Sequence, residues 1–203
     1  MTKESKAQYL AAYQHAKSHT AMHAPAWLSE LREAGITSFE AIGFPTLKHE
    51  DWKYTNVEPI AAQSFGHANG EARHVSASEI VARSMAEPAA PRLVFVNGIY
   101  RQEFSRTAAL DRGVVVTSLG DFIKADDATA SSRLGRYASG QRQPFVALNT
   151  AFLADGAAVS IGAGCRAEQP IYLVFVSTAA AEPVVSHPRT LIVLGAGSEA
   201  KII

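Results

Sequence analysis

The chain has 203 residues, of which 47% are hydrophobic and 19% charged, and its 19 Lys and Arg balance its 19 Asp and Glu. This is the composition of a folded globular protein, with enough residues for one sizeable core or two small ones. A formal charge of zero provides no broad attraction to nucleic acid or to anionic lipid, so we expect neither a nucleic acid nor a membrane as a partner.

The first residues, MTKESKAQYL, are polar and charged and lack the apolar centre of a signal peptide. No apolar run approaches the roughly 18 residues that a membrane helix needs. The single cysteine, Cys165, excludes an internal disulfide. We therefore expect a cytoplasmic protein.

Residues 1–70 are predicted to form an N-terminal helical region. In KESKAQYLAAYQHAKSH the apolar residues form one stripe at helical spacing, and Pro25 suits the first turn of a second helix. Gly35 is expected to end that second helix, and a further short turn over 38–42 is expected to end at Gly43.

Residues 71–156 are predicted to be a mixed αβ region. RLVFV and IYRQEF flank Asn97-Gly98, which favours a type I′ hairpin turn, and VVVTSL adds a further strand. Residues 119–124 and 128–137 are expected to be helical, as is PFVALNTAFLADG.

Residues 157–203 change to short strands, AAVSI, PIYLVFV, PRTLIVL and SEAKII, with no helix between them. This rhythm indicates a sandwich, a barrel or a parallel β-solenoid. The fold class is therefore α+β. The last strand has no polar cap, so we expect the isolated chain to self-associate, with a homodimer as the expected outcome.

Two stretches imitate a dinucleotide-binding fingerprint, Gly162-Ala-Gly164-Cys-Arg-Ala167 and Gly195-Ala-Gly197-Ser-Glu-Ala200. Each follows a strand, but neither is followed by the helix whose N-terminus would face a pyrophosphate. We therefore interpret both as turns between strands.

Other candidate groups for metal or acid/base chemistry are incomplete. His15, His19 and His23 have helical spacing but no completing Cys or acid, and a single cysteine cannot hold an iron–sulfur cluster. The adjacent carboxylates Glu50-Asp51 and Asp126-Asp127 point in different directions on any regular element. The residues themselves indicate no catalytic, cofactor-binding or metal site.

The stretch HEDWKYTN after Pro45 has an unusual density of charged and aromatic residues. Thr46 is expected to cap a short helical turn here, with Glu50 and Asp51 near its positive end. Trp52 and Tyr54 are expected to supply buried area rather than chemistry.

The longer stretch FPTLKHEDWKYTNVEPI resembles the N-terminal signature of the SufD proteins, iron–sulfur cluster assembly proteins of the SUF system within the SufB/SufD family. Four further stretches agree with that family in order: Phe95-Val-Asn-Gly98, Ala147-Leu-Asn-Thr-Ala-Phe-Leu-Ala-Asp-Gly156, Glu168-Gln-Pro-Ile171 and His187-Pro-Arg189. The likeness spans nearly the whole chain.

The resemblance implies a helical region and a small mixed region that lead, from residue 157 to residue 203, into the first turns of a right-handed parallel β-helix. It also implies a scaffold subunit rather than an enzyme, with SufB and SufC as partners and with the cluster handled by the complex. The chain has about half the length expected for the family, and the family's functionally implicated histidine is expected beyond Ile203. No catalytic, cofactor or metal residue is therefore carried over. Two other interpretations stay open: a β-helix enzyme of the acyltransferase type and a free-standing interaction module.

Overall fold

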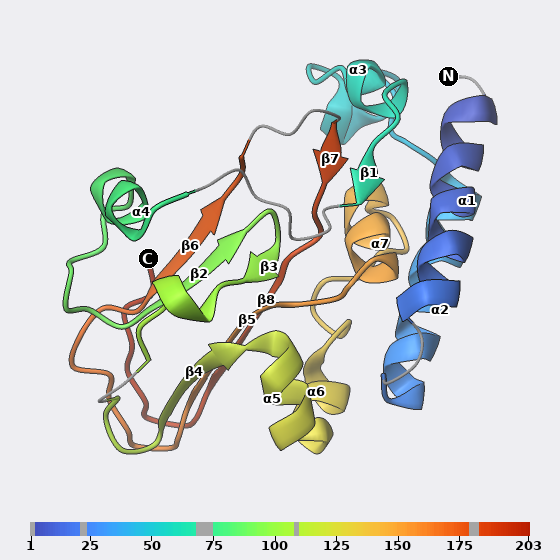
Figure 1. The fold of residues 1–203 in the computed structure, drawn as a ribbon. Helices are drawn as coiled ribbons and strands as arrows, with labels where there is room; N and C mark the ends of the chain where they lie inside the picture. The colour runs from blue at the N-terminus through green and yellow to red at the C-terminus, as the bar shows by residue number, and fades with distance from the viewer. Residues whose placement is uncertain (1–2, 21–23, 68–74, 108–109, 179–182) are drawn as a thin grey trace. The chain divides into compact units, whose positions relative to one another are not determined.

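The computed structural model describes residues 3–20, 24–67, 75–107, 110–178 and 183–203 (Figure 1). Contacts between Cα atoms group the chain into two compact units. The helical unit combines residues up to Phe65 with Ser131–Leu153, and the sheet unit combines Gly66–Ala130 with Ala154–Ile203. The predicted α+β class is confirmed. The predicted division into domains over 1–70, 71–156 and 157–203 stays a prediction.

The helical unit is built around a cluster of aromatic rings. Its elements are α1 (Lys3–Thr20), α2 (Ala26–Ile42), the 3-10 turn η2 (Glu50–Trp52), α3 (Glu58–Ala61) and α7 (Pro144–Ala151). The Phe39 and Phe44 rings meet edge to face with centroids 5.0 Å apart, and the Tyr9 ring lies 5.1 Å from that of Phe44. Such pairs stabilise beyond the area they bury. The first helix agrees with its predicted apolar stripe.

Gly35 does not end the second helix, and that prediction was wrong. Helix α2 continues through Gly35 to Ile42, and Gly43, with φ 66°, follows its last residue. Gly35 is buried because α2 and α7 approach each other there: a Cβ on Gly35 would lie 2.7 Å from the Ala151 backbone nitrogen. This glycine provides space between two helices instead of a turn.

The described residues of the sheet unit form three small sheets and several short helices. Its elements are β1 (Gly66–His67), α4 (Ala77–Arg83), β2 (Arg92–Val96), β3 (Ile99–Tyr100), η3 (Gln102–Phe104), β4 (Val114–Ser118), α5 (Leu119–Ala125), β5 (Gly156–Ile161), β6 (Tyr172–Val176), β7 (Val184–Val185) and β8 (Arg189–Leu194). The strand orders are β1-β7, β3-β2-β6 and β4-β5-β8. Figure 1 shows β4, β5 and β8 running side by side.

The predicted hairpin at Asn97-Gly98 is confirmed. Strands β2 and β3 pair antiparallel, and both turn residues have positive φ, 51° for Asn97 and 80° for Gly98. The helix expected over 119–124 is also confirmed by α5. The helix expected over 128–137 is shorter, since α6 spans Asp127–Arg133 and Gly135 then takes a φ of 76°.

Strands β1 and β7, β2 and β6, and β5 and β8 pair in parallel, whereas β4 and β5 pair antiparallel from Val114↔Ile161 to Ser118↔Ala157. Strand β5 pairs with β8 from Gly156↔Arg189 to Ile161↔Leu194, and an isolated bridge at Arg166↔Glu199 continues the same 33-residue offset. The segment SEAKII, predicted as a strand, forms isolated parallel bridges at Glu199 and Ile202 rather than a continuous strand.

Candidate functional site

The strongest candidate site is the outer edge of β8, here called the open edge (residues 189–194). Within the described residues β8 pairs with β5 alone, so its other edge has no strand partner there. Leu191 is buried at 8% exposure, whereas Ile192 and Leu194 are 45% and 53% exposed. An edge strand with exposed aliphatic side chains can pair with another polypeptide.

The two glycine motifs lie at the ends of β5 and β8 and stack on each other. The Gly164 N–H donates to the Ala196 carbonyl oxygen at 2.9 Å, and Gly164 and Gly197 share a φ of 67°. A Cβ on Gly195 would overlap the backbone of Ala163. An isolated β-bridge follows each turn, not a helix, so the interpretation of both motifs as turns is confirmed.

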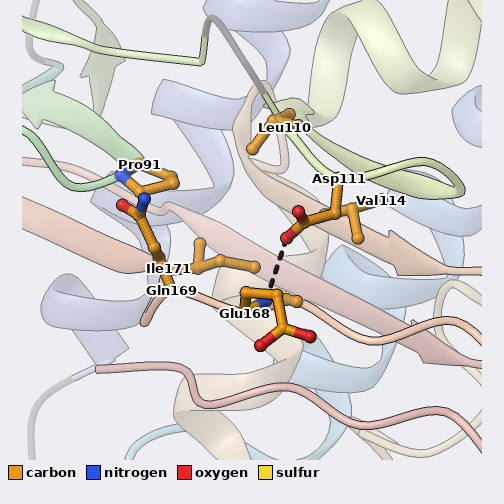
Figure 2. A pocket seen from close by; sticks show the side chains of 8 residues that line it. Pro91, Leu110, Asp111, Val114, Glu168, Gln169 and Ile171 are labelled. Atoms are coloured by element: carbon orange, nitrogen blue, oxygen red, sulfur yellow. Dashed lines mark hydrogen bonds between the residues drawn. The ribbon is translucent and has the colours of Figure 1, made fainter.

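A small hollow of about 40 Å³ lies beside these turns (Figure 2). Its lining residues come from two loops and the ends of strands: Pro91, Leu110, Asp111, Val114, Ala167, Glu168, Gln169 and Ile171. The Glu168 backbone N–H donates to Asp111 Oδ2 at 2.9 Å, which fixes one loop against the other. Metabolite sites commonly measure roughly 300 to 1,000 Å³. This hollow has room for solvent rather than for a substrate.

The stretch HEDWKYTN is mostly exposed. Thr46 stabilises the turn that precedes η2. Its N–H donates to His49 Nδ1 at 3.0 Å, and its hydroxyl accepts from the Lys48 N–H at 3.3 Å. Trp52 is half-buried, with its ring centroid 5.3 Å from that of Phe145. The expectation that Tyr54 supplies buried area was wrong, because its side chain is 91% exposed. The stretch is therefore anchored by Trp52 and presents its other side chains to solvent.

We expect Trp52→Ala to lower the free energy of unfolding by about 1 to 2 kcal/mol, less than the roughly 3 to 5 kcal/mol of a fully buried aromatic residue. The half-buried indole loses its contact with Phe145 but exposes only a partial cavity. Tyr54→Ala is the matched control, and it should change stability by no more than about 0.5 kcal/mol. Urea unfolding measures both. Equal losses for the two variants would contradict the assigned anchoring role.

The remaining candidates for metal or acid/base chemistry do not assemble. His15 is exposed on α1, while the His19 side chain and all of His23 fall outside what the structure describes. Cys165 is half-buried, and its thiol donates weakly to the Ala163 carbonyl oxygen at 3.7 Å. Across the described parts of the chain, no three His, Cys, Asp or Glu side chains are grouped so that they could hold a metal ion.

The paired carboxylates have separate surroundings. Glu50 and Asp51 are exposed, and Asp126 accepts from the Thr129 N–H at 3.1 Å. Hydrogen bonds from the side chain and the backbone of Thr129 lower the pKa of Asp126. Burial raises the pKa of Asp155, although its carboxylate accepts from the Gly120 N–H at 2.9 Å. That carboxylate holds the first turn of α5 against the start of β5, which is a structural role.

These observations define an α+β protein with parallel strand pairs, whose candidate site is the open edge. The family pattern "SufBD protein N-terminal region" matches residues 3–173, so the chain belongs to the SufBD family through its N-terminal region. The resemblance inferred from the sequence is confirmed at that level. An iron–sulfur cluster assembly SufBD family protein of Synechocystis is 28% identical over 163 residues. The match covers 80% of this chain and 35% of the relative, so the chain corresponds to about a third of that protein's length. None of the helices in the described segments is long and apolar enough to cross a membrane.

Proposed function

We propose that this chain is a SufD-like scaffold region that acts in iron–sulfur cluster assembly together with SufB and SufC in the cytoplasm. Membership in the SufBD family supports the proposal, as does the name of the Synechocystis relative. The stretch Glu50-Asp-Trp-Lys-Tyr-Thr55 favours a SufD-like over a SufB-like protein. In this role the chain is not an enzyme and has no resident cofactor, and the cluster is the cargo of the complex.

We also propose that residues 157–203 form the first turns of a right-handed parallel β-helix. The supporting observation is the constant offset of 33 residues between β5 and β8, which extends through the stacked turns to the Arg166↔Glu199 bridge. A solenoid covers each turn with the next one, so the open edge is where further backbone would pair. This edge is the single observation that carries the proposed scaffold role.

The partner proposal is tested by co-expressing the tagged chain with SufB and SufC. The expected result is recovery of SufB with the chain, and weaker recovery when Ile192→Lys places a charge on the open edge. Val115→Lys is the matched control, because Val115 is also 45% exposed but lies on β4, at the other side of the same sheet. Failure to recover SufB with the unsubstituted chain would overturn the proposed partnership.

We expect the isolated 203-residue chain to self-associate through residues 170–203, with a dimer as the main species. The exposed Ile192 and Leu194 and the strand edge beside them favour pairing between copies. Analytical ultracentrifugation over a range of concentrations measures the association. Ile192→Lys should weaken the dimer and Val115→Lys should not. A strict monomer at high concentration, with slow amide exchange throughout β8, would contradict this prediction.

A further inference from the structure

The Asn97-Gly98 turn is fastened to the end of β6 by the asparagine side chain. Asn97 Nδ2 donates to Thr178 Oγ1 at 2.8 Å, and the Thr178 N–H donates to Asn97 Oδ1 at 2.9 Å. The Asn97 N–H also donates to the Val176 carbonyl oxygen at 2.8 Å. Asn97 is only 7% exposed, and both atoms of its amide are used. The two side-chain bonds to Thr178 are here called the Asn97 latch.

An Asn-Gly dipeptide can react with itself, since glycine has no Cβ to shield its backbone nitrogen. The Gly98 nitrogen forms a bond to Asn97 Cγ and loses its proton to solvent, while the Cγ–Nδ2 bond breaks and Nδ2 takes up a proton from solvent and leaves as ammonia. Water then opens the resulting succinimide to an aspartate or an isoaspartate at position 97. The step requires the Asn97 amide to turn toward its own backbone, and in the closed latch it is bonded to Thr178 instead.

We propose that Asn97 is a deamidation site gated by the Asn97 latch. Asn97 does not deamidate while its side-chain amide is hydrogen-bonded to Thr178, and it reacts when the ends of β2 and β6 separate. A second constraint acts on Gly98: a Cβ at this position would lie 2.6 Å from Ser186 Cβ, so the segment after β7 crosses the turn closely. The backbone at the reacting nitrogen therefore has little room to rearrange until this region opens.

Deamidation would make a transient opening permanent. An isoaspartate adds a methylene to the main chain within a turn whose two residues have φ of 51° and 80°. Either product also replaces the Nδ2 donor of the latch by a carboxylate oxygen. The original pair of hydrogen bonds to Thr178 cannot form again. Deamidated Asn97 is therefore a lasting chemical mark of a hairpin that has opened.

The experiment follows deamidation by peptide mass spectrometry in the full chain at mildly alkaline pH, folded and in urea. The chain contains a second Asn-Gly dipeptide, Asn69-Gly70, outside the described residues, which serves as an internal reference for the unfolded rate. In urea both sites should react at similar rates. In the folded chain Asn97 should react about tenfold or more slowly than in urea, since two hydrogen bonds must break first. Equal rates at Asn97 in the two conditions would overturn the proposal.

A substitution at the partner residue tests the gate directly. Thr178→Val removes the hydroxyl that accepts from Asn97 Nδ2 and should accelerate deamidation at Asn97 severalfold, with no change at Asn69. Thr55→Val is the matched control, because Thr55 is an exposed threonine of the helical unit and should leave both rates unchanged. If Thr178→Val unfolds the chain, circular dichroism will show it. The comparison of deamidation rates in the folded and the unfolded parent chain then tests the proposal by itself. A folded Thr178→Val variant with the parental rate at Asn97 would show that the latch is not the gate.

Discussion

Gly156→Ala is expected to lower the free energy of unfolding of the sheet unit by about 4 kcal/mol or more. Gly156 begins β5, and the backbone of Arg189 in β8 passes so close that a Cβ at position 156 would overlap the Arg189 carbonyl oxygen. Gly156 also has a φ of 154°. The added methyl group cannot be accommodated by a side-chain rotation, because the atoms it meets belong to the backbone. Urea unfolding followed by circular dichroism measures the loss.

Gly164→Ala separates the steric effect from that of backbone conformation. Gly164 has a φ of 67°, but a Cβ there would meet no atom within 4 Å. Alanine in this left-handed conformation costs about 1 to 2 kcal/mol. If Gly156→Ala and Gly164→Ala destabilise the protein equally, the close approach of β5 and β8 does not determine the outcome.

We expect Gly35→Ala to lower the free energy of unfolding of the helical unit by about 2 to 3 kcal/mol. The new methyl group would lie 3.0 Å from the Ala147 carbonyl oxygen and 2.7 Å from the Ala151 nitrogen, so α2 and α7 would have to separate. The loss is expected although alanine favours a helix over glycine by about 1 kcal/mol. Thermal unfolding monitored by circular dichroism checks the sign.

The control for Gly35→Ala is the same substitution at another helical glycine, Gly120. At Gly120, in α5, a Cβ would lie 3.5 Å from Asp155 Oδ1, an ordinary contact. Gly120→Ala should therefore raise stability by about 0.5 kcal/mol. A gain in stability for both variants would show that the two helices tolerate a wider spacing.

Local signals in the sequence predict the local structure well. The apolar stripe of the first helix and the Asn-Gly turn each report interactions between residues that are close in the chain, and both are confirmed. Gly35 was misjudged because a glycine that ends a helix and one that admits a neighbouring helix look alike in the sequence. The contacts that distinguish them come from α7, more than a hundred residues away.

The candidate site could have been located more closely from the sequence. The segments GAAVSIGAGCRA and RTLIVLGAGSEA repeat a strand followed by Gly-Ala-Gly-x-x-Ala at a spacing of 33 residues, which matches the observed strand register. Treating the two glycine motifs separately concealed that repeat. The exposure of Ile192 could not be predicted, because it depends on the pairing of β8 with β5.

The strand register also has a consequence for the order of assembly. Pairing β8 with β5 joins residues 33 positions apart, whereas the parallel pair of β2 and β6, from Arg92↔Tyr172 onward, joins residues 80 positions apart. In a flexible unfolded chain the entropy of closing the longer loop costs about 0.8 kcal/mol more. Contacts between nearer residues also form faster in general. The stacked turns are therefore expected to form first and to provide the surface on which β2 and its hairpin are later fastened.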